Sequence, residues 1–325
     1  MGTLSFEAGC RRNRAMQILD LRQVSSRSLE PLFVEEARQW KQELRWDYRP
    51  SLELIRKFID SRALRGAVAI DGERPAGYGF YVLEERKGLI GGLFVAPHAS
   101  EPEITRVLLQ EMLETLWSTP RIERVEAQLM PFGTSLESVK LSRQFRLHSR
   151  QFMLLELPGA RLKSPALSAG LRLDPWSDRS FESCARLIHL AYANHVDGEI
   201  NDQYCSKAGG MKFLRNIVIL PGCGQFLPEA SFLLRPVNHE RPIGMVLTSC
   251  VSESVGHTTQ ICVMPGYHGQ GLGRYLIESA IRALRARQFH TLSLTVTSSN
   301  TPAVRLYESL GFRTIKTFAA GVWTP

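Results

Sequence analysis

The chain has 325 residues, of which 44% are hydrophobic and 22% charged, a globular composition with enough length for two domains of ordinary size. The net charge of +8 would suit a nucleic-acid-binding protein, but the lysines and arginines are scattered through both halves without a basic run, so nucleic acid is not an expected partner. No run of about 18 apolar residues occurs, so no membrane span is expected, and residues 1–14 lack the apolar core of a secretory signal, so we expect a disordered tail there.

The first half alternates between strand and helix patterns. Apolar periodicity predicts a strand at 16–21, helices at 28–44 and 51–58, strands at 67–70, 76–83 and 91–95, a helix at 103–117, and strands at 125–130 and 151–156. Ser51 is placed to cap the second helix, and the Asp-Gly-Glu at 71–73 predicts a hairpin turn. Prolines and a glycine then break the pattern, which predicts a first domain at 1–158 and a linker at 159–170.

The second half, 171–325, repeats the first. It predicts a strand at 171–174, helices at 181–193 and 211–217, and strands at 231–234 and 243–251. Landmarks recur at a near-constant distance, because 241 − 74 = 167 for an Arg-Pro-x-Gly, 265 − 97 = 168 for a proline after a strand and 312 − 145 = 167 for a phenylalanine. The first strands are closer, so the second half should carry about 13 extra residues within 194–229.

The six cysteines form no C-x-x-C pair, and the histidines show no metal-ligand spacing with them. We therefore expect free thiols in a reducing cytoplasm and no bound metal.

The stretch from Ile261 to Gly273, ICVMPGYHGQGLG, reads as a strand, a glycine loop and the start of a helix. Glycines let the backbone approach an anion, and a helix N-terminus offers unpaired N–H groups, so this layout predicts a phosphate-binding turn. A dinucleotide site would need its third glycine one residue later and a carboxylate after the next strand, and a Walker loop would need Gly-Lys-Ser/Thr. None of these is present.

The pattern His268-Gly-Gln-Gly-Leu-Gly273 instead resembles the [Q/R/H]-x-x-G-x-G loop of the GNAT superfamily of acyl-CoA-dependent N-acyltransferases. Residues 300–312, NTPAVRLYESLGF, resemble the family's N-x-x-A-x-x-L-Y-x-x-x-G-F element. The resemblance implies an α+β (α/β/α) fold: two GNAT-like domains in tandem, each a mixed, mostly antiparallel, splayed sheet flanked by helices. The segment after Pro97 has no glycine, and Glu101 and Glu103 would repel a pyrophosphate, so we interpret the first half as a degenerate domain.

The resemblance also implies acetyl-CoA as cosubstrate and an amine of a small molecule or peptide as acceptor, with direct attack in a ternary complex. It assigns cofactor binding to the strand, loop and helix residues Ile261, Cys262, Val263, His268, Gly269, Gln270, Gly271, Leu272, Gly273, Arg274, Asn300 and Ala303. Tyr307 matches the family's proton donor to the leaving thiolate, although a tyrosine on a helix more often only packs by its ring. A non-catalytic CoA-binding regulatory or scaffold module remains the alternative function.

Two further assignments concern the acceptor. Some family members place a glutamate base six residues before the position of Val263, where this chain has His257; the alternative is a half-exposed histidine at a strand end. The polar stretch 194–204 offers Asp197, Asn201 and Tyr204 as candidate contacts to an amine, although such stretches are usually solvated loops.

Overall fold

The computed structural model describes residues 16–97, 99, 101–130, 145–163, 167–220 and 222–324. The tail expected at 1–14 lies outside these residues. The first half contains, in chain order, β1 (Met16–Asp20), α1 (Glu30–Leu44), α2 (Arg49–Asp60), β2 (Arg65–Asp71), β3 (Arg74–Glu84), β4 (Lys87–Val95), α3 (Glu101–Ser118), β5 (Arg124–Gln128) and β6 (Phe145–Glu156).

The second half follows the same order with additions. Its elements are β7 (Leu171–Pro175), α4 (Phe181–Ala191), α5 (Val196–Ile200), the 3₁₀ turn η6 (Asp202–Cys205), α6 (Lys207–Val218), β8 (Gln225–Phe226), β9 (Phe232–Pro236), β10 (Gly244–Ser252), β11 (Val255–Val263), α7 (Leu272–Ala286), β12 (Thr291–Thr297), α8 (Thr301–Leu310) and β13 (Arg313–Trp323). The additions α5, η6 and β8 lie within 194–229, where the sequence placed the extra residues.

The capping prediction for α2 is wrong. The helix begins at Arg49 with Tyr48 as its N-cap, because Pro50 supplies a fixed helical φ in the first turn. Ser51 is therefore already inside the helix.

The two halves repeat element by element. β4 and β11 begin at residues 87 and 255, and β6 and β13 begin at 145 and 313, so both pairs are 168 residues apart. β5 and β12 begin at 124 and 291, which is 167 residues apart. The offset expected from isolated landmarks thus extends over whole strands.

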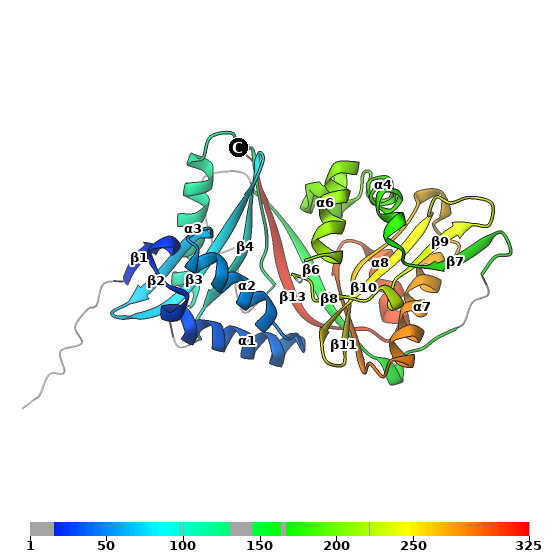
Figure 1. The fold of residues 1–325 in the computed structure, drawn as a ribbon, viewed down its shortest axis with the longest axis horizontal. Helices are drawn as coiled ribbons and strands as arrows, with labels where there is room; N and C mark the ends of the chain where they lie inside the picture. Colours follow the sequence, from blue (N-terminus) through cyan, green and yellow to red (C-terminus); the bar gives the residue numbers. More distant parts are fainter. Residues whose placement is uncertain are drawn as a thin grey trace, which may run out of the picture.

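The strands of the two halves form one sheet in the order β1-β2-β3-β4-β5-β13-β6-β12-β11-β10-β9-β7. β6, from the first half, pairs with β12, while β13, from the second half, pairs with β5. β6 and β13 also pair with each other, side by side through the middle of the molecule (Figure 1). Each half therefore receives its last strand from the other, and the predicted linker does not separate the two sheets.

The core follows this exchange. Trp323 of β13 is 1% exposed and packs into the cluster formed by the first-half sheet and α3. Trp40 and Trp46, at the end of α1, pack against Phe152, Val251 and Phe318, so one apolar cluster contains residues of both halves. A backbone bond from Asp47 N–H to the Val251 carbonyl, 2.8 Å, adds to this contact.

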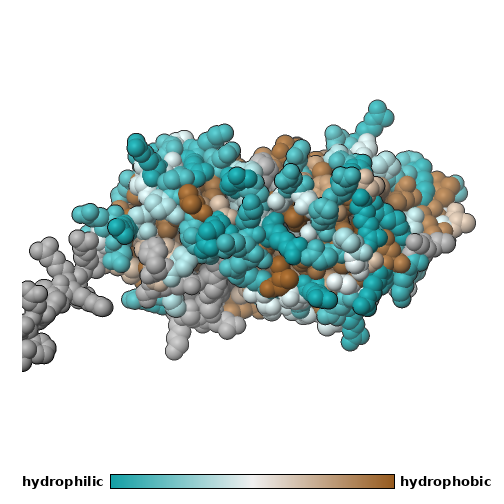
Figure 2. All heavy atoms as spheres, turned by 90° about the horizontal axis from the view of Figure 1, so that it is seen from below, coloured by the Kyte–Doolittle hydropathy of each residue, from teal (hydrophilic) through white to brown (hydrophobic). Residues whose placement is uncertain are grey.

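Helices cover both faces of the sheet in each half. In the first, α3 packs on one face and α1 with α2 on the other; in the second, α7 and α8 pack on one face and α4 with α6 on the other (Figure 1). The surface in Figure 2 is mostly hydrophilic, with hydrophobic residues in small patches. Within the described residues, no helix is both long enough and apolar enough to cross a membrane.

Candidate functional site

The site begins where β11 and β12 separate. The two strands pair in parallel from Val255–Thr291 to Thr258–Leu294, and the ladder stops there. At the same level β11 has a bulge. Leu247 of β10 pairs with Gln260 and Thr248 pairs with Thr258, so Thr259 has no partner on β10. Beyond this point the backbone of β11 is free of β12, so a ligand can lie between the strands.

A pocket of about 670 Å³ occupies this opening. It brings together most of the residues that the sequence singled out: Asp197, Tyr204, Ile261, Cys262, Val263, His268, Gly269, Gly271, Leu272, Gly273, Arg274, Asn300, Ala303 and Tyr307. Gln270, Asn201 and His257 do not line it.

The glycine loop forms one end of the pocket. Gly269 and Gly271 have φ of 76° and 74°, and a side chain added at either would meet no atom within 4 Å, so the loop combines left-handed backbone with open space. Gly271 is the N-cap of α7 and no side chain caps that helix, so its first N–H groups are available. Together with the helix dipole, this end of the pocket suits an anion such as a pyrophosphate.

The start of α8 forms a second wall. Asn300 caps the helix, its Oδ1 accepting from the Ala303 N–H at 3.3 Å. The Asn300 Nδ2 lies 3.2 Å from Nε2 of His195, a pocket residue that the sequence analysis missed. The cap therefore links the helix to the extra segment of the second half.

Tyr307 lies two turns along α8, with its side chain against the pocket and only 5% of the residue exposed. Burial raises the pKa of its phenol, and the nearby Asp197 carboxylate raises it further. The hydroxyl therefore keeps its proton at neutral pH, as a proton donor must.

His257 is not positioned to act as a base in this pocket. Its Nδ1 lies 2.9 Å from the Ser293 Oγ, and its ring packs against Trp46 and Phe152 at centroid distances of 4.9 and 5.8 Å. Burial among these groups lowers the pKa of His257 to about 3. Its neighbours Thr258 and Thr259 line the pocket, but the His257 side chain points away from it, toward Ser293, Trp46 and Phe152.

Aromatic side chains of the second half form the far wall. Tyr192 and Tyr204 stack at 4.4 Å, and the Tyr192 hydroxyl donates to the Gln260 Oε1 at 3.0 Å. Asp197 lies beside them, its Oδ1 accepting from the Thr297 hydroxyl. Sequence reasoning missed Tyr192 because it is the C-cap of α4 and precedes the polar stretch 194–204.

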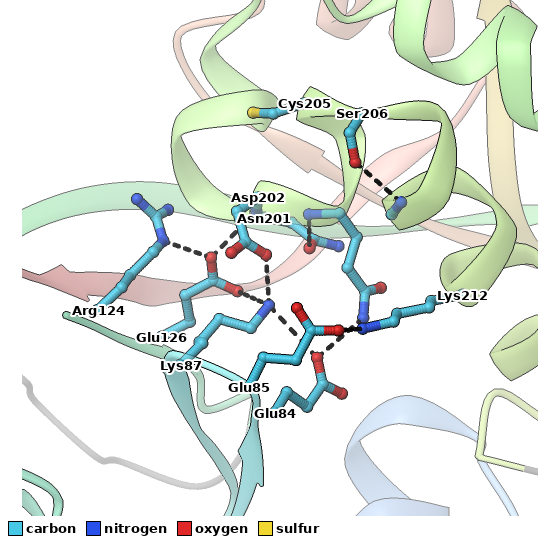
Figure 3. A network of polar contacts seen from close by, with 12 residues as sticks. Glu84, Glu85, Lys87, Arg124, Glu126, Asn201, Asp202, Cys205, Ser206 and Lys212 are labelled. Carbon is cyan, nitrogen blue, oxygen red and sulfur yellow. Dashed lines mark hydrogen bonds and ion pairs between the residues drawn. The ribbon is translucent and has the colours of Figure 1, made fainter. Parts of the chain in front are cut away.

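The segment α5–η6, which carries Asp197 and Tyr204, is held by the first half (Figure 3). Lys87 Nζ lies 3.2 Å from Glu126 Oε2 and 2.5 Å from Asp202 Oδ1, and the Asp202 N–H donates to Glu126 Oε1 at 3.0 Å. Asn201 contributes by capping η6 with its side chain, not by lining the pocket, which corrects its predicted role. The first half thus positions one wall of the site.

Part of the chain is similar in sequence to known proteins. Residues 213–312 match the acetyltransferase (GNAT) family. A 61-residue segment, 19% of this chain and 19% of the relative, is 46% identical to mycothiol acetyltransferase from Acidothermus cellulolyticus. A 52-residue segment, 16% of this chain and 35% of the relative, is 54% identical to the ribosomal protein bS18-alanine N-acetyltransferase of Escherichia coli. The chain therefore matches only 19% to 35% of the length of these relatives.

The structural similarity to solved proteins covers much more of the chain than these two segments. A tandem GNAT protein from the clavulanic acid biosynthesis pathway, 14% identical, superposes with a TM-score of 0.58 over 95% of this chain and 98% of its own. The predicted fold, two GNAT-like domains with mixed sheets flanked by helices, is confirmed. The parallel pairs β4–β5 and β11–β12 alternate with antiparallel neighbours, as that fold class requires.

Proposed function

The second half of this chain carries a domain of the GNAT acetyltransferase family, and we propose from this premise that its pocket transfers an acetyl group from acetyl-CoA to an amine. One observation carries the proposal: the glycine loop of α7 and the phenol of Tyr307 line the same opening between β11 and β12. An anion site alone would suit many ligands, and a buried tyrosine alone would be a core residue. Their meeting at a splayed strand suits a long thioester whose reactive end reaches the phenol.

The reaction proceeds in one ternary complex. The pyrophosphate of acetyl-CoA lies on the N–H groups that begin α7, and the pantetheine arm lies along the unpaired edge of β11 from Ile261 to Val263. The amine nitrogen attacks the thioester carbonyl, the C–N bond forms and the C–S bond breaks. Tyr307 gives its proton to the departing thiolate.

The amine must lose a proton before or during attack. Asp197 attracts the ammonium form to the pocket, and His195, whose Nδ1 lies 3.6 Å from the Asp197 Oδ2, is an imidazole that lines it. We propose that His195, and not His257, accepts the proton that the amine loses. We place the reaction in the cytoplasm, since the five cysteines that the structure describes are free thiols.

Release of free CoA, measured with the pure protein against a panel of amines, tests the proposal. The panel includes free amino acids, polyamines, amino sugars and a peptide with an N-terminal alanine, the last because of the name of one relative. We expect CoA release above the acceptor-free background with at least one class. A chain that binds acetyl-CoA yet never exceeds that background is the non-catalytic CoA-binding module.

A further inference from the structure

One side chain of the pocket comes from the first half. Arg150 belongs to β6, the strand that crosses to pair with β12, and it lines the opening beside Tyr204 and Asp197. We propose that the acceptor amine carries a carboxylate and that Arg150 binds it, so that the substrate class is a free amino acid or a close analogue. This inference rests on the proposed acetyl transfer and specifies its acceptor.

Arg150 is a cation without an anion. Its Nη1 donates to the Gln128 Oε1 at 2.6 Å, a neutral partner, and no carboxylate of the described residues lies within 4.0 Å of it. Its buried Nε also has no acceptor among those residues. Arg150 is partly buried and lines the pocket, so its positive charge faces the space that a ligand would occupy, and a ligand with a negative charge would pair with it.

Thr297 connects Arg150 with a negative charge, the carboxylate of Asp197. Arg150 is the ladder partner of Thr297, and the Thr297 hydroxyl donates to Asp197, whose side chain is 14% exposed. Both charges act on the phenol of Tyr204: burial is the main cause of its raised pKa, Asp197 adds to the rise and Arg150 opposes it. A cation and an anion thus border one cavity without pairing, which is complementary to a zwitterion.

A neutral donor lies in the same wall. Gln260 is 5% exposed; its Oε1 accepts from the Tyr192 hydroxyl, while its Nε2 has no partner among the described residues. An unsatisfied buried amide N–H requires an acceptor oxygen, and a carboxylate offers more than one.

The charge balance favours a carboxylate over a phosphate. One guanidinium with its Nη1 already engaged neutralises a single negative charge, and its planar geometry matches a carboxylate. The CoA phosphates have their own site at the start of α7, beyond β11, whereas Arg150 lies on β6, on the far side of β12. Arg150 is therefore assigned to the acceptor.

Matched acceptors test this inference. Each free amino acid of a panel is compared with its carboxamide and its decarboxylated amine, which keep the amine but lose the negative charge. The wild type should show a kcat/KM for the acid at least tenfold above that for the amide. Arg150→Gln should lower kcat/KM for the acid on the order of 10²-fold, the usual scale for removing one member of a buried charge pair, and leave that for the amide within about twofold.

Two variants complete the design. Arg150→Lys keeps the charge and should recover part of the preference for the acid. Arg313→Gln removes an exposed arginine on β13 and should change kcat/KM for neither the acid nor the amide. The affinity for acetyl-CoA should be the same in all variants. Equal use of acid and amide by the wild type, or an equal loss of both in Arg150→Gln, would overturn the assignment.

Binding is measured separately from turnover. The same acid and amide pairs are titrated calorimetrically into the protein saturated with CoA, and the acid should bind more tightly in the wild type only. If no amine is acetylated but this preference is found, the catalytic proposal fails and the carboxylate site stands. If turnover occurs without any preference, the catalytic proposal stands and the carboxylate site fails.

Discussion

Arg150 and Phe318 are ladder partners in the β6–β13 pair and are also counterparts in the two halves, since 318 − 150 = 168. The pseudo-two-fold axis of the tandem therefore passes between them. The two positions have different roles: Arg150 lines the pocket, whereas Phe318 packs with Trp40 and Trp46. The repeat thus supplies a symmetric frame, and single substitutions at equivalent positions make it asymmetric.

Tyr307→Phe should lower kcat on the order of 10²–10⁴-fold, the usual contribution of one general acid. The ring and its packing stay, so the dissociation constant of acetyl-CoA should be nearly unchanged. Because burial holds the pKa of Tyr307 above its usual value, the wild-type phenol is protonated throughout the neutral range, and the loss should not vary with pH from 6 to 9. Steady-state kinetics across that range check this prediction.

The matched control is Tyr275→Phe, a partly exposed tyrosine of α7 outside the pocket, which should keep full activity. Full activity in Tyr307→Phe would mean that solvent protonates the thiolate.

Gly271→Glu should abolish acetyl-CoA binding. The substitution places a negative side chain in the open space of the loop, where it repels the pyrophosphate, and it forces a non-glycine residue to φ 74°. Gly72→Glu, at the hairpin between β2 and β3 with φ 67°, carries the same backbone strain away from the pocket and should bind normally. Calorimetry should give one site per chain for the wild type. A second tight site would show that the first half also binds the cofactor.

His257→Gln should flatten the pH dependence of stability. The folded-state pKa of about 3 lies below the ordinary value of 6.5, so the unfolded chain binds the proton first as pH falls. The wild type should lose unfolding free energy below pH 6.5, by roughly 1.4 kcal/mol per unit, and the variant should lack this contribution. Urea unfolding at pH 7 and pH 5 measures it. The pH–rate profiles of the two proteins should coincide; a displaced profile would return His257 to the reaction.

Trp323→Ala should destabilise the whole molecule by about 3–5 kcal/mol, the usual cost of truncating a buried large aromatic side chain. Trp323 is 1% exposed in the core of the first half although it belongs to the last strand of the second. Ile315→Ala, on the same strand but 44% exposed, should cost little. Urea unfolding followed by hydrogen exchange at β5 checks both. Unchanged protection of β5 in Trp323→Ala would contradict the role given to the exchanged strand.

Local patterns allowed the glycine loop and the Asn300–Tyr307 element to be found, because each is a contiguous run whose spacing reflects one turn or one helix. Arg150 could not be found this way. Its strand looks like any other half-buried strand, and alternation does not say in which sheet a strand will pair. His257 was misplaced for a related reason: counting back along β11 assumes regular alternation, and the bulge at Thr259 breaks it.

The exchange of last strands also dictates when the molecule can fold. β5 is made long before its partner β13, since residues 129–312, which are 184 residues, lie between the end of one and the start of the other. At about 5–20 residues per second the nascent first half waits on the order of ten seconds with the edge of β5 open. Such an open edge can pair with strands of other chains until β13 covers it. A stop codon that removes β13, only 11 residues near the C-terminus, would therefore leave the first half incomplete even though every residue of it had been made.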